Sequence, residues 1–141
     1  MFKVMPLTAE CIPPKKEYDG DAGFDVYNNE ASIVIAPGDR VCLNLGFALE
    51  LEIGCVALIQ EKSGMALKKG LFTIGNVIDC NYRGPCHAIL VNFGKEPVAI
   101  LKGQKIAQML IIPCYTGKTY DIVSNLEESN RDTEGLGSTG L

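Results

Sequence analysis

The chain has 141 residues, of which 47% are hydrophobic, and a formal net charge of −4 at pH 7. This length suits one domain with a core of its own. The absence of an apolar run of about 18 residues argues against a membrane span, and the acidic charge argues against direct nucleic-acid binding, although a few local cations and backbone N–H groups can still hold a single nucleotide.

The first 20 residues predict a short strand followed by an extended surface loop. An apolar start, Phe2 to Leu7, gives way to Pro13, Pro14 and two lysines, which do not suit a buried strand. Because no long apolar stretch opens the chain, we expect no secretory signal and an intracellular location, in the cytoplasm, the nucleus or both.

From Ala31 onward, short apolar runs recur at intervals of roughly ten residues, each bounded by Gly, Pro, Asn or Asp. The runs cover residues 31–36, 41–51, 55–60, 71–78, 87–93, 97–102 and 105–115. This spacing is typical of an all-β sandwich or jelly roll. Helical periodicity is absent apart from a single turn over Met65 to Lys69.

The segment 75–84, GNVIDCNYRG, predicts a β-hairpin. Two β-branched residues, Val77 and Ile78, run into a turn rich in Asp, Asn and Gly, and the run 87–93 follows directly. Asp79 would then lie at the bend of the hairpin. It can aim its carboxylate into a pocket, or it can be an ordinary turn aspartate that bonds its own backbone.

After Val123 the composition changes, because residues 124–141 contain only three strongly apolar side chains, all leucine. Such a segment cannot pack a core of its own and favours a flexible tail. We therefore expect a folded domain over residues 1–123 and a tail over 124–141.

The six cysteines are scattered, with no C-x-x-C pair, so we expect reduced thiols and no zinc site. His87 is the only histidine and opens an apolar run, which favours a structural role over a catalytic one.

Five segments in order resemble those of the trimeric dUTPases, the dUTP nucleotidohydrolases, and they extend over most of the chain. They are DAGFDVY (21–27), KSGMALKKG (62–70), GNVIDCNYRG (75–84), KGQKIAQML (102–110) and RDTEGLGSTG (131–140). The resemblance implies a distorted jelly-roll subunit of the β-clip type in a homotrimer. It also implies Mg²⁺-dependent hydrolysis of dUTP to dUMP and pyrophosphate, which keeps uracil out of DNA and supplies dUMP for dTMP synthesis.

In the family, each of three sites takes its first, second and fourth segments from one subunit, the third segment from a second subunit and the tail from a third. The tail closes over the bound nucleotide. A single subunit of this chain would then hold no complete site.

The resemblance assigns the chemistry to the third segment and the metal to the first. Asp79 would be the base that activates the water attacking the α-phosphorus. Tyr82 would lie beneath the deoxyribose and reject a 2′-hydroxyl, and the backbone of Asn76, Val77 and Ile78 would pair with the uracil edge. Asp25 would help to hold a hydrated Mg²⁺ that bridges the phosphates.

The remaining segments supply phosphate and base contacts. Lys62, Ser63 and Gly64 offer a cation, a hydroxyl and a backbone N–H to the phosphates, and Gln108 would donate to them from a strand end. In the tail, the resemblance assigns the clamping of the γ-phosphate, the covering of the uracil and the wrapping of the phosphates to Arg131, Leu136, Gly137, Ser138 and Thr139.

The chain departs from the family at several of these positions. Lys62 replaces the usual Arg, Asn76 the usual Gly and Leu136 the usual Phe, while Glu134 adds a negative charge to the tail. Gln104 and Lys105 replace a more usual Asp-Arg pair, which we expect to be structural. These departures leave open a catalytically weak or inactive dUTPase-like regulatory protein that binds nucleotide. A dCTP deaminase, which shares the fold, is a third interpretation.

Overall fold

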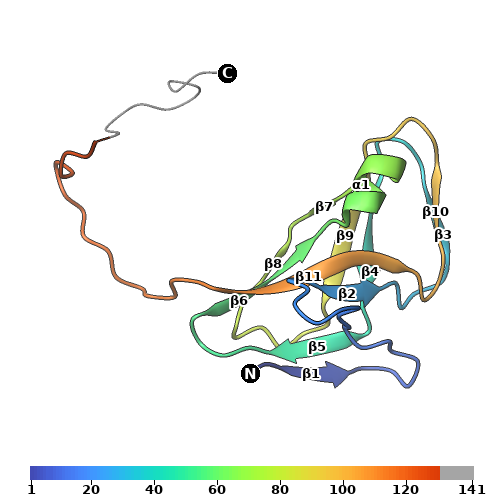
Figure 1. Ribbon diagram of the computed structural model, residues 1–141, viewed down its shortest axis with the longest axis horizontal. Helices are drawn as coiled ribbons and strands as arrows, with labels where there is room; N and C mark the ends of the chain where they lie inside the picture. Colours follow the sequence, from blue (N-terminus) through green and yellow to red (C-terminus); the bar gives the residue numbers. More distant parts are fainter. Residues whose placement is uncertain (131–141) are drawn as a thin grey trace.

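The computed structural model describes residues 1–130, and within them the chain forms eleven strands and one short helix (Figure 1). The strands are β1 (Lys3–Pro6), β2 (Phe24–Tyr27), β3 (Ile33–Ile35), β4 (Arg40–Asn44), β5 (Phe47–Glu50), β6 (Cys55–Gln60), β7 (Leu71–Ile74), β8 (Val77–Ile78), β9 (His87–Asn92), β10 (Val98–Ile100) and β11 (Lys105–Pro113), and the helix is α1 (Ser63–Lys69). The all-β class predicted from the spacing of the apolar runs is confirmed.

Glycines divide two of the predicted runs into separate strands. The run 41–51 becomes β4 and β5 because the chain turns at Gly46, whose φ of +81° is unfavourable for other residues. The side chain of Asn29 also packs there, so a Cβ at residue 46 would lie 2.5 Å from Asn29 Cγ. The run 71–78 divides into β7 and β8 at Gly75, where φ is +62°.

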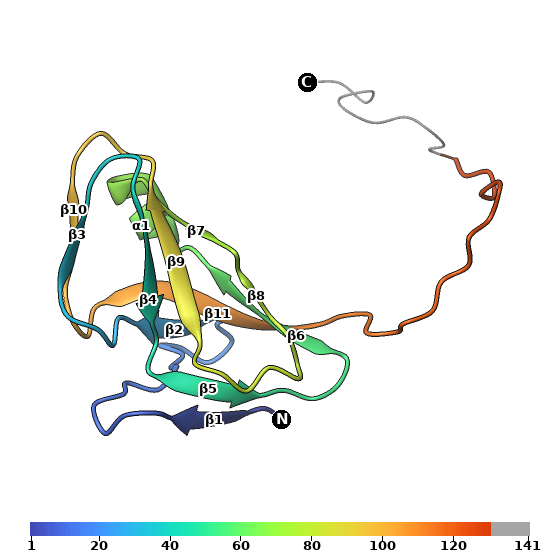
Figure 2. The same cartoon turned by 180° about the vertical axis from the view of Figure 1, so that it is seen from behind.

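The strands pair in antiparallel fashion in four small sheets, which Figure 2 shows from behind. One sheet has four strands in the order β2-β11-β6-β8, and another has three in the order β4-β9-β7. Two further pairs, β1-β5 and β3-β10, flank them. Strand β11 is the longest and passes between β2 and β6, which places residues of the first and fourth family segments side by side.

The hairpin predicted between Val77–Ile78 and residues 87–93 is wrong. Strand β8 pairs with β6, with Ile78 opposite Ala57, whereas β9 pairs with β4 and β7 in another sheet. The loop between β8 and β9 has eight residues, 79–86, and is longer than the connections of most hairpins. Asp79 therefore opens a loop that joins two sheets.

The single turn predicted over Met65 to Lys69 is the end of α1, which already begins at Ser63. The carbonyl of Lys62 accepts the first helical hydrogen bonds, from the N–H groups of Met65 and Ala66 at 2.9 Å each. The helix ends at Lys69 and is capped by Gly70, whose left-handed φ of +65° lets its N–H bond back to the carbonyl of Ala66. Residues 62–64 thus form the start of a helix.

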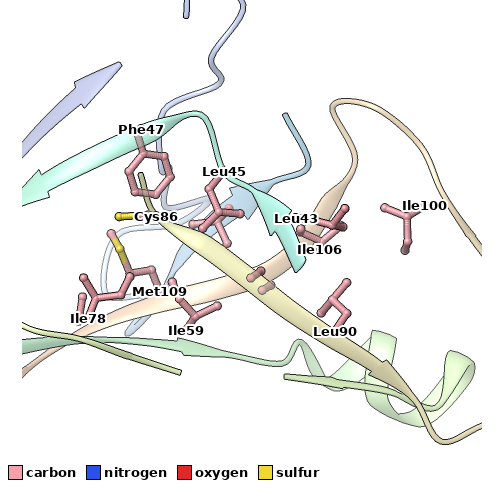
Figure 3. Packing of buried hydrophobic residues seen from close by; sticks show 14 of the residues in the cluster. Leu43, Leu45, Phe47, Ile59, Ile78, Cys86, Leu90, Ile100, Ile106 and Met109 are labelled. Atoms are coloured by element: carbon pink, nitrogen blue, oxygen red, sulfur yellow. The ribbon is translucent and has the colours of Figure 1, made fainter. Parts of the chain in front are cut away.

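The core lies between the sheets and is almost entirely aliphatic (Figure 3). Its largest fully buried side chains include Leu43, Phe47, Ile59, Ile106 and Met109, which come from the four strands β4, β5, β6 and β11. Burial of this apolar surface is the main force that holds the short sheets together.

Two asparagines are also fully buried, and both are hydrogen-bonded. The side-chain amide of Asn28 donates to Leu101 O at 3.2 Å, and that of Asn92 donates to Ile35 O and Glu96 O at 2.9 Å each. These hydrogen bonds satisfy the buried amide groups, which offsets the cost of their burial.

Beyond Pro113 the chain leaves the body as an extended segment, residues 114–130, which we call the C-terminal arm (Figure 1). Its first residue is still anchored, because the N–H of Cys114 donates to Gly54 O at 2.8 Å. Side chains along the arm are exposed, among them Tyr120, Ile122 and Leu126. The expected division at residue 123 stays a prediction. Within residues 1–130, no helix is long and apolar enough to cross a membrane.

Candidate active site

Asp25 lies in the middle of β2, directly opposite Gln108 of β11. Its side chain is only 10% exposed, yet both carboxylate oxygens have a cationic partner. Lys62 Nζ contacts Oδ1, and Lys105 Nζ lies 2.9 Å from Oδ2. A buried carboxylate is stable only with such partners.

The pKa of Asp25 reflects these contacts. Burial alone would raise it, but the hydrogen bonds from Lys62 and Lys105 outweigh burial and lower the pKa below its ordinary value of 3.8. Asp25 is therefore a carboxylate at neutral pH. In turn, hydrogen bonds to Asp25 and Glu17 raise the pKa of Lys105.

A bulge in β11 brings Lys105 to this site. Lys105 stands opposite Tyr27 and Ala107 opposite Val26, so β11 has one extra residue, Ile106, at this point. The extra residue turns Lys105 onto the same face of the sheet as Asp25 and Gln108. Sequence reasoning assigned Lys105 only a structural role. No periodicity in the sequence marks the bulge.

These residues border a cavity of about 370 Å³, which we call the Asp25 pocket. Its polar lining is Glu17, Tyr18, Asp21, Asp25, Lys62, Lys105 and Gln108. The structure thus brings together three residues that the resemblance assigned to the phosphate end of the substrate, namely Asp25, Lys62 and Gln108. Two cations and three carboxylates in one cavity suit a ligand that carries both phosphate groups and a divalent ion.

Two further residues assigned to the phosphates are next to this pocket in the chain. Ser63 and Gly64 are exposed and form the first two positions of α1. The neighbouring carboxylate of Glu61 accepts a hydrogen bond from Thr73 Oγ1 at 3.1 Å, which holds this carboxylate against β7.

Asp79 is exposed and begins the loop after β8. Its carbonyl accepts a bond from the N–H of Tyr82 at 3.1 Å, which closes a turn. Arg83 Nη1 fixes the same turn by donating to Cys80 O at 2.7 Å and to Tyr82 O at 2.9 Å. The Asp79 carboxylate therefore lies on a turn that is held in place by hydrogen bonds to backbone carbonyls.

Tyr82 folds back over this loop. Its hydroxyl donates to Pro85 O at 3.2 Å, and its ring lies so close to Gly84 that a Cβ there would meet the phenolic oxygen at 2.3 Å. With Val77, Ile78 and Asp79 it lines a cavity of about 200 Å³, the Asp79 pocket. An apolar floor, a carboxylate and a phenol suit a nucleoside better than a phosphate chain.

Asn76, assigned to the uracil edge, uses its carbonyl to accept the N–H of Ile59 at 3.0 Å. Its side-chain Oδ1 is buried without a hydrogen-bond partner among the described residues.

The Asp25 pocket and the Asp79 pocket have no lining residue in common. One chain therefore carries two separate groups of predicted site residues, one with Asp25, Lys62 and Gln108, and one with Asp79 and Tyr82. The predicted contacts of Arg131, Leu136, Gly137, Ser138 and Thr139 lie outside the described residues, as does Glu134.

The fold is that of the phage dUTPases. The dUTPase of Staphylococcus bacteriophage 80alpha with dUpNHpp matches with a TM-score of 0.87 and 23% identity, over 100% of this chain and 99% of that one. A mutant dUTPase from phage phi11 of S. aureus, whose structure reveals the coordination of a structural Mg(II) ion, matches with a TM-score of 0.81 and 21% identity, over 91% and 99% of the two chains.

Sequence comparison is more specific. The family model for dUTPase matches residues 9–140. The deoxyuridine 5′-triphosphate nucleotidohydrolase of Clostridioides difficile is 37% identical over 142 residues, which cover 99% of this chain and 98% of the relative. That of Corynebacterium diphtheriae is 37% identical over 144 residues, 100% and 93% of the two chains. The chain belongs to the dUTPase family.

Proposed function

We infer that this chain is a dUTP diphosphatase, which hydrolyses the α–β phosphoanhydride of dUTP to dUMP and pyrophosphate. Relatives that are dUTP nucleotidohydrolases align with essentially the whole chain at 34–37% identity. The observation that carries the proposal is the exposed Asp79 carboxylate, held at a turn next to a pocket lined by Val77, Ile78 and Tyr82.

Asp79 acts as the base. A carboxylate within one hydrogen bond of a water molecule can orient it for in-line attack on the α-phosphorus and accept its proton. The pocket beside it takes the deoxyuridine, with the uracil edge at the backbone of residues 76–78. Tyr82, whose ring the bond to Pro85 O holds down, lies beneath the deoxyribose and leaves no space for the 2′-hydroxyl of UTP.

The Asp25 pocket takes the phosphates. Lys62, Gln108, Ser63 and Gly64 supply a cation, an amide, a hydroxyl and a backbone N–H, while Arg131 and residues 137–139 complete the set, and Leu136 covers the base. Mg²⁺ fits the donors present. Residues 1–130 hold no cluster of three metal-ligating side chains, and Mg²⁺ is commonly held by one carboxylate, waters and substrate phosphates. Asp25 would hold it through water, and the ion would neutralise phosphate charge.

The active form is a homotrimer. The two pockets have no lining residue in common, which supports a site built from more than one chain. We place Asp25, Lys62 and Gln108 from one subunit against Asp79 and Tyr82 from a second and the tail from a third. The exposed apolar side chains of the C-terminal arm support assembly, since Tyr120, Ile122 and Leu126 gain from burial against another copy.

In the cell, this reaction lowers dUTP, so that less uracil enters DNA, and it supplies dUMP for dTMP synthesis. We expect the enzyme in the cytoplasm, the nucleus or both, where nucleoside triphosphates are used.

Pyrophosphate release from dUTP, dTTP, dCTP and UTP with Mg²⁺ tests the proposal, with wild type and Asp79→Asn compared. Release from dUTP alone, lost in Asp79→Asn, is the expected result. Asp39→Asn is the matched control, because Asp39 is exposed on another turn and lines neither pocket. No release from any nucleotide by a protein that still binds dUpNHpp would favour the regulatory alternative, and ammonia release from dCTP would favour a deaminase.

A further inference from the structure

We propose that Lys105 is a positioning residue for dUTP hydrolysis, which holds Oδ2 of Asp25 while Oδ1 becomes free for the hydrated metal. The inference rests on the proposed function and adds Lys105, which we had expected to be only structural, to the residues that act in the reaction.

The contacts of Asp25 divide its two oxygens between two lysines. Lys62 is on Oδ1, and Lys105 is 2.9 Å from Oδ2. Lys105 has a second anchor, because its Nζ also lies 3.0 Å from Glu17 Oε2. Lys62 makes no second ion pair among the residues described.

This difference decides which lysine can leave. Lys62 is the residue expected to bind phosphate, so it must turn from Oδ1 toward the substrate. Lys105 would give up two ion pairs if it left, and it is fixed on this face by the bulge of β11. We therefore assign Lys62 to the moving contact and Lys105 to the permanent one.

The permanent contact between Lys105 and Asp25 is needed for charge balance. Asp25 is nine-tenths buried, and a buried carboxylate without any cation is costly. With Lys105 in place, Asp25 keeps one cation when Lys62 moves to the phosphates. Without Lys105, Lys62 is the only lysine that can neutralise Asp25, so it stays on Oδ1. The phosphates then lack the cation of Lys62, and Oδ1 is not free for the metal.

The test compares Lys105→Met and Lys105→Arg with the control variant Lys102→Met. Among the described residues, Lys102 forms an ion pair only with Glu10, and it lines neither the Asp25 pocket nor the Asp79 pocket. Two quantities are measured, namely the Mg²⁺ concentration for half-maximal dUTP hydrolysis and the gain in calorimetric affinity for dUpNHpp that Mg²⁺ produces. Lys105→Met should raise the first by about tenfold, the low end for loss of a residue that orients a metal ligand. It should reduce the second by a similar factor.

At saturating Mg²⁺, kcat should change much less, because Lys105 touches no reacting atom. Lys105→Arg should restore both quantities, since a guanidinium can also bridge Asp25 and Glu17. In an Asp25→Asn background, Lys105→Met should have little additional effect on the gain in dUpNHpp affinity that Mg²⁺ produces.

An unchanged Mg²⁺ requirement and unchanged Mg²⁺-dependent dUpNHpp binding in folded Lys105→Met would overturn the inference. If that variant does not fold, Glu17→Gln replaces it, with a smaller shift in the same direction expected and no shift overturning the inference. If wild type releases no pyrophosphate, the proposed function fails, whereas the calorimetric measurement still decides whether Lys105 positions Asp25.

Discussion

Gln108 lies so close to Gly23 that a methyl group on residue 23 would stand 2.6 Å from Gln108 Oε1. The backbone at Gly23 is outside the left-handed region, so the glycine is needed for space and not for its conformation. The same amide donates from Nε2 to Glu61 O at 3.0 Å. A glycine of the first family segment thus fixes the glutamine of the fourth.

Gly23→Ala should therefore destabilise the fold by about 1–3 kcal/mol, as overpacking commonly does, and should raise the KM for dUTP by displacing Gln108. Adding Gln108→Ala should recover much of the stability, because it removes the collision. Urea unfolding of wild type, both single variants and the double variant measures the coupling. Additive losses would show that the two side chains do not compete for one space.

Lys62→Arg should strengthen phosphate binding. A guanidinium presents a planar fork that can bond two phosphate oxygens at once, which a single ammonium cannot do as well. We expect the KM for dUTP to fall by up to about tenfold, equal to roughly 1.4 kcal/mol, with little change in kcat. Steady-state kinetics at saturating Mg²⁺ measure both, and a KM that stays the same or rises would contradict the expectation.

Two inactive variants should restore activity to each other. Asp25→Asn removes a carboxylate of the Asp25 pocket, and Asp79→Asn removes the carboxylate of the Asp79 pocket. In the proposed trimer, each site takes Asp25 and Asp79 from different chains. Equal amounts, unfolded together and refolded, should regain about a quarter of wild-type activity, since each of the two contributing chains has an even chance of being the right one. Each variant refolded alone is the control. Mixtures no more active than the separate variants would place both residues in one chain's site.

Stability should fall at alkaline pH because of Cys86. Burial raises the pKa of this thiol from 9.0 to about 12. Between these values the unfolded chain loses a proton that the folded chain keeps, so the free energy of unfolding declines as pH rises from 9.0 toward about 12. In Cys86→Ala this part of the decline should vanish, although the variant is less stable throughout. Urea unfolding across the range, with Cys42→Ala for comparison, measures the difference, and identical slopes in wild type and Cys86→Ala would refute it.

Leu136→Phe should lower the KM for dUTP or raise kcat. The family's usual residue here is an aromatic that stacks on the uracil, and leucine covers a base without stacking. Kinetics with dUTP measure the change, and Leu136→Met controls for size alone. If Phe does no better than Met, the substitution in this chain does not weaken the closure of the tail.

The sequence predicted most strands because apolar runs and their Gly or Pro boundaries are local features. The strand β6 covers the same residues as the run 55–60. Pairing is not local, and this is why the hairpin after Ile78 was wrong. Ile78 lies opposite Ala57, more than 20 residues earlier in the chain, and nothing in residues 75–93 records that contact.

The candidate site shows the same division. Asp25, Lys62, Gln108 and Asp79 were predicted as site residues because they lie in the family segments, whereas Lys105 departs from the family pattern and was assigned only a structural role. Its contact with Asp25 depends on a one-residue bulge in β11, and the sequence around Ile106 reads as an ordinary apolar strand.

Among the described residues, every buried hydrophobic side chain lies between Val26 and Met109, and the C-terminal arm contributes none. The fold of the described residues therefore does not depend on buried apolar side chains from the C-terminal arm. Trypsin acting after the exposed Lys118 would remove the tail and leave the core intact. A clipped chain of this kind would remain folded but would lack Tyr120, Ile122 and Leu126, the side chains that we expect the proposed trimer to bury, so that proteolysis would yield an intact subunit with a weakened capacity to assemble.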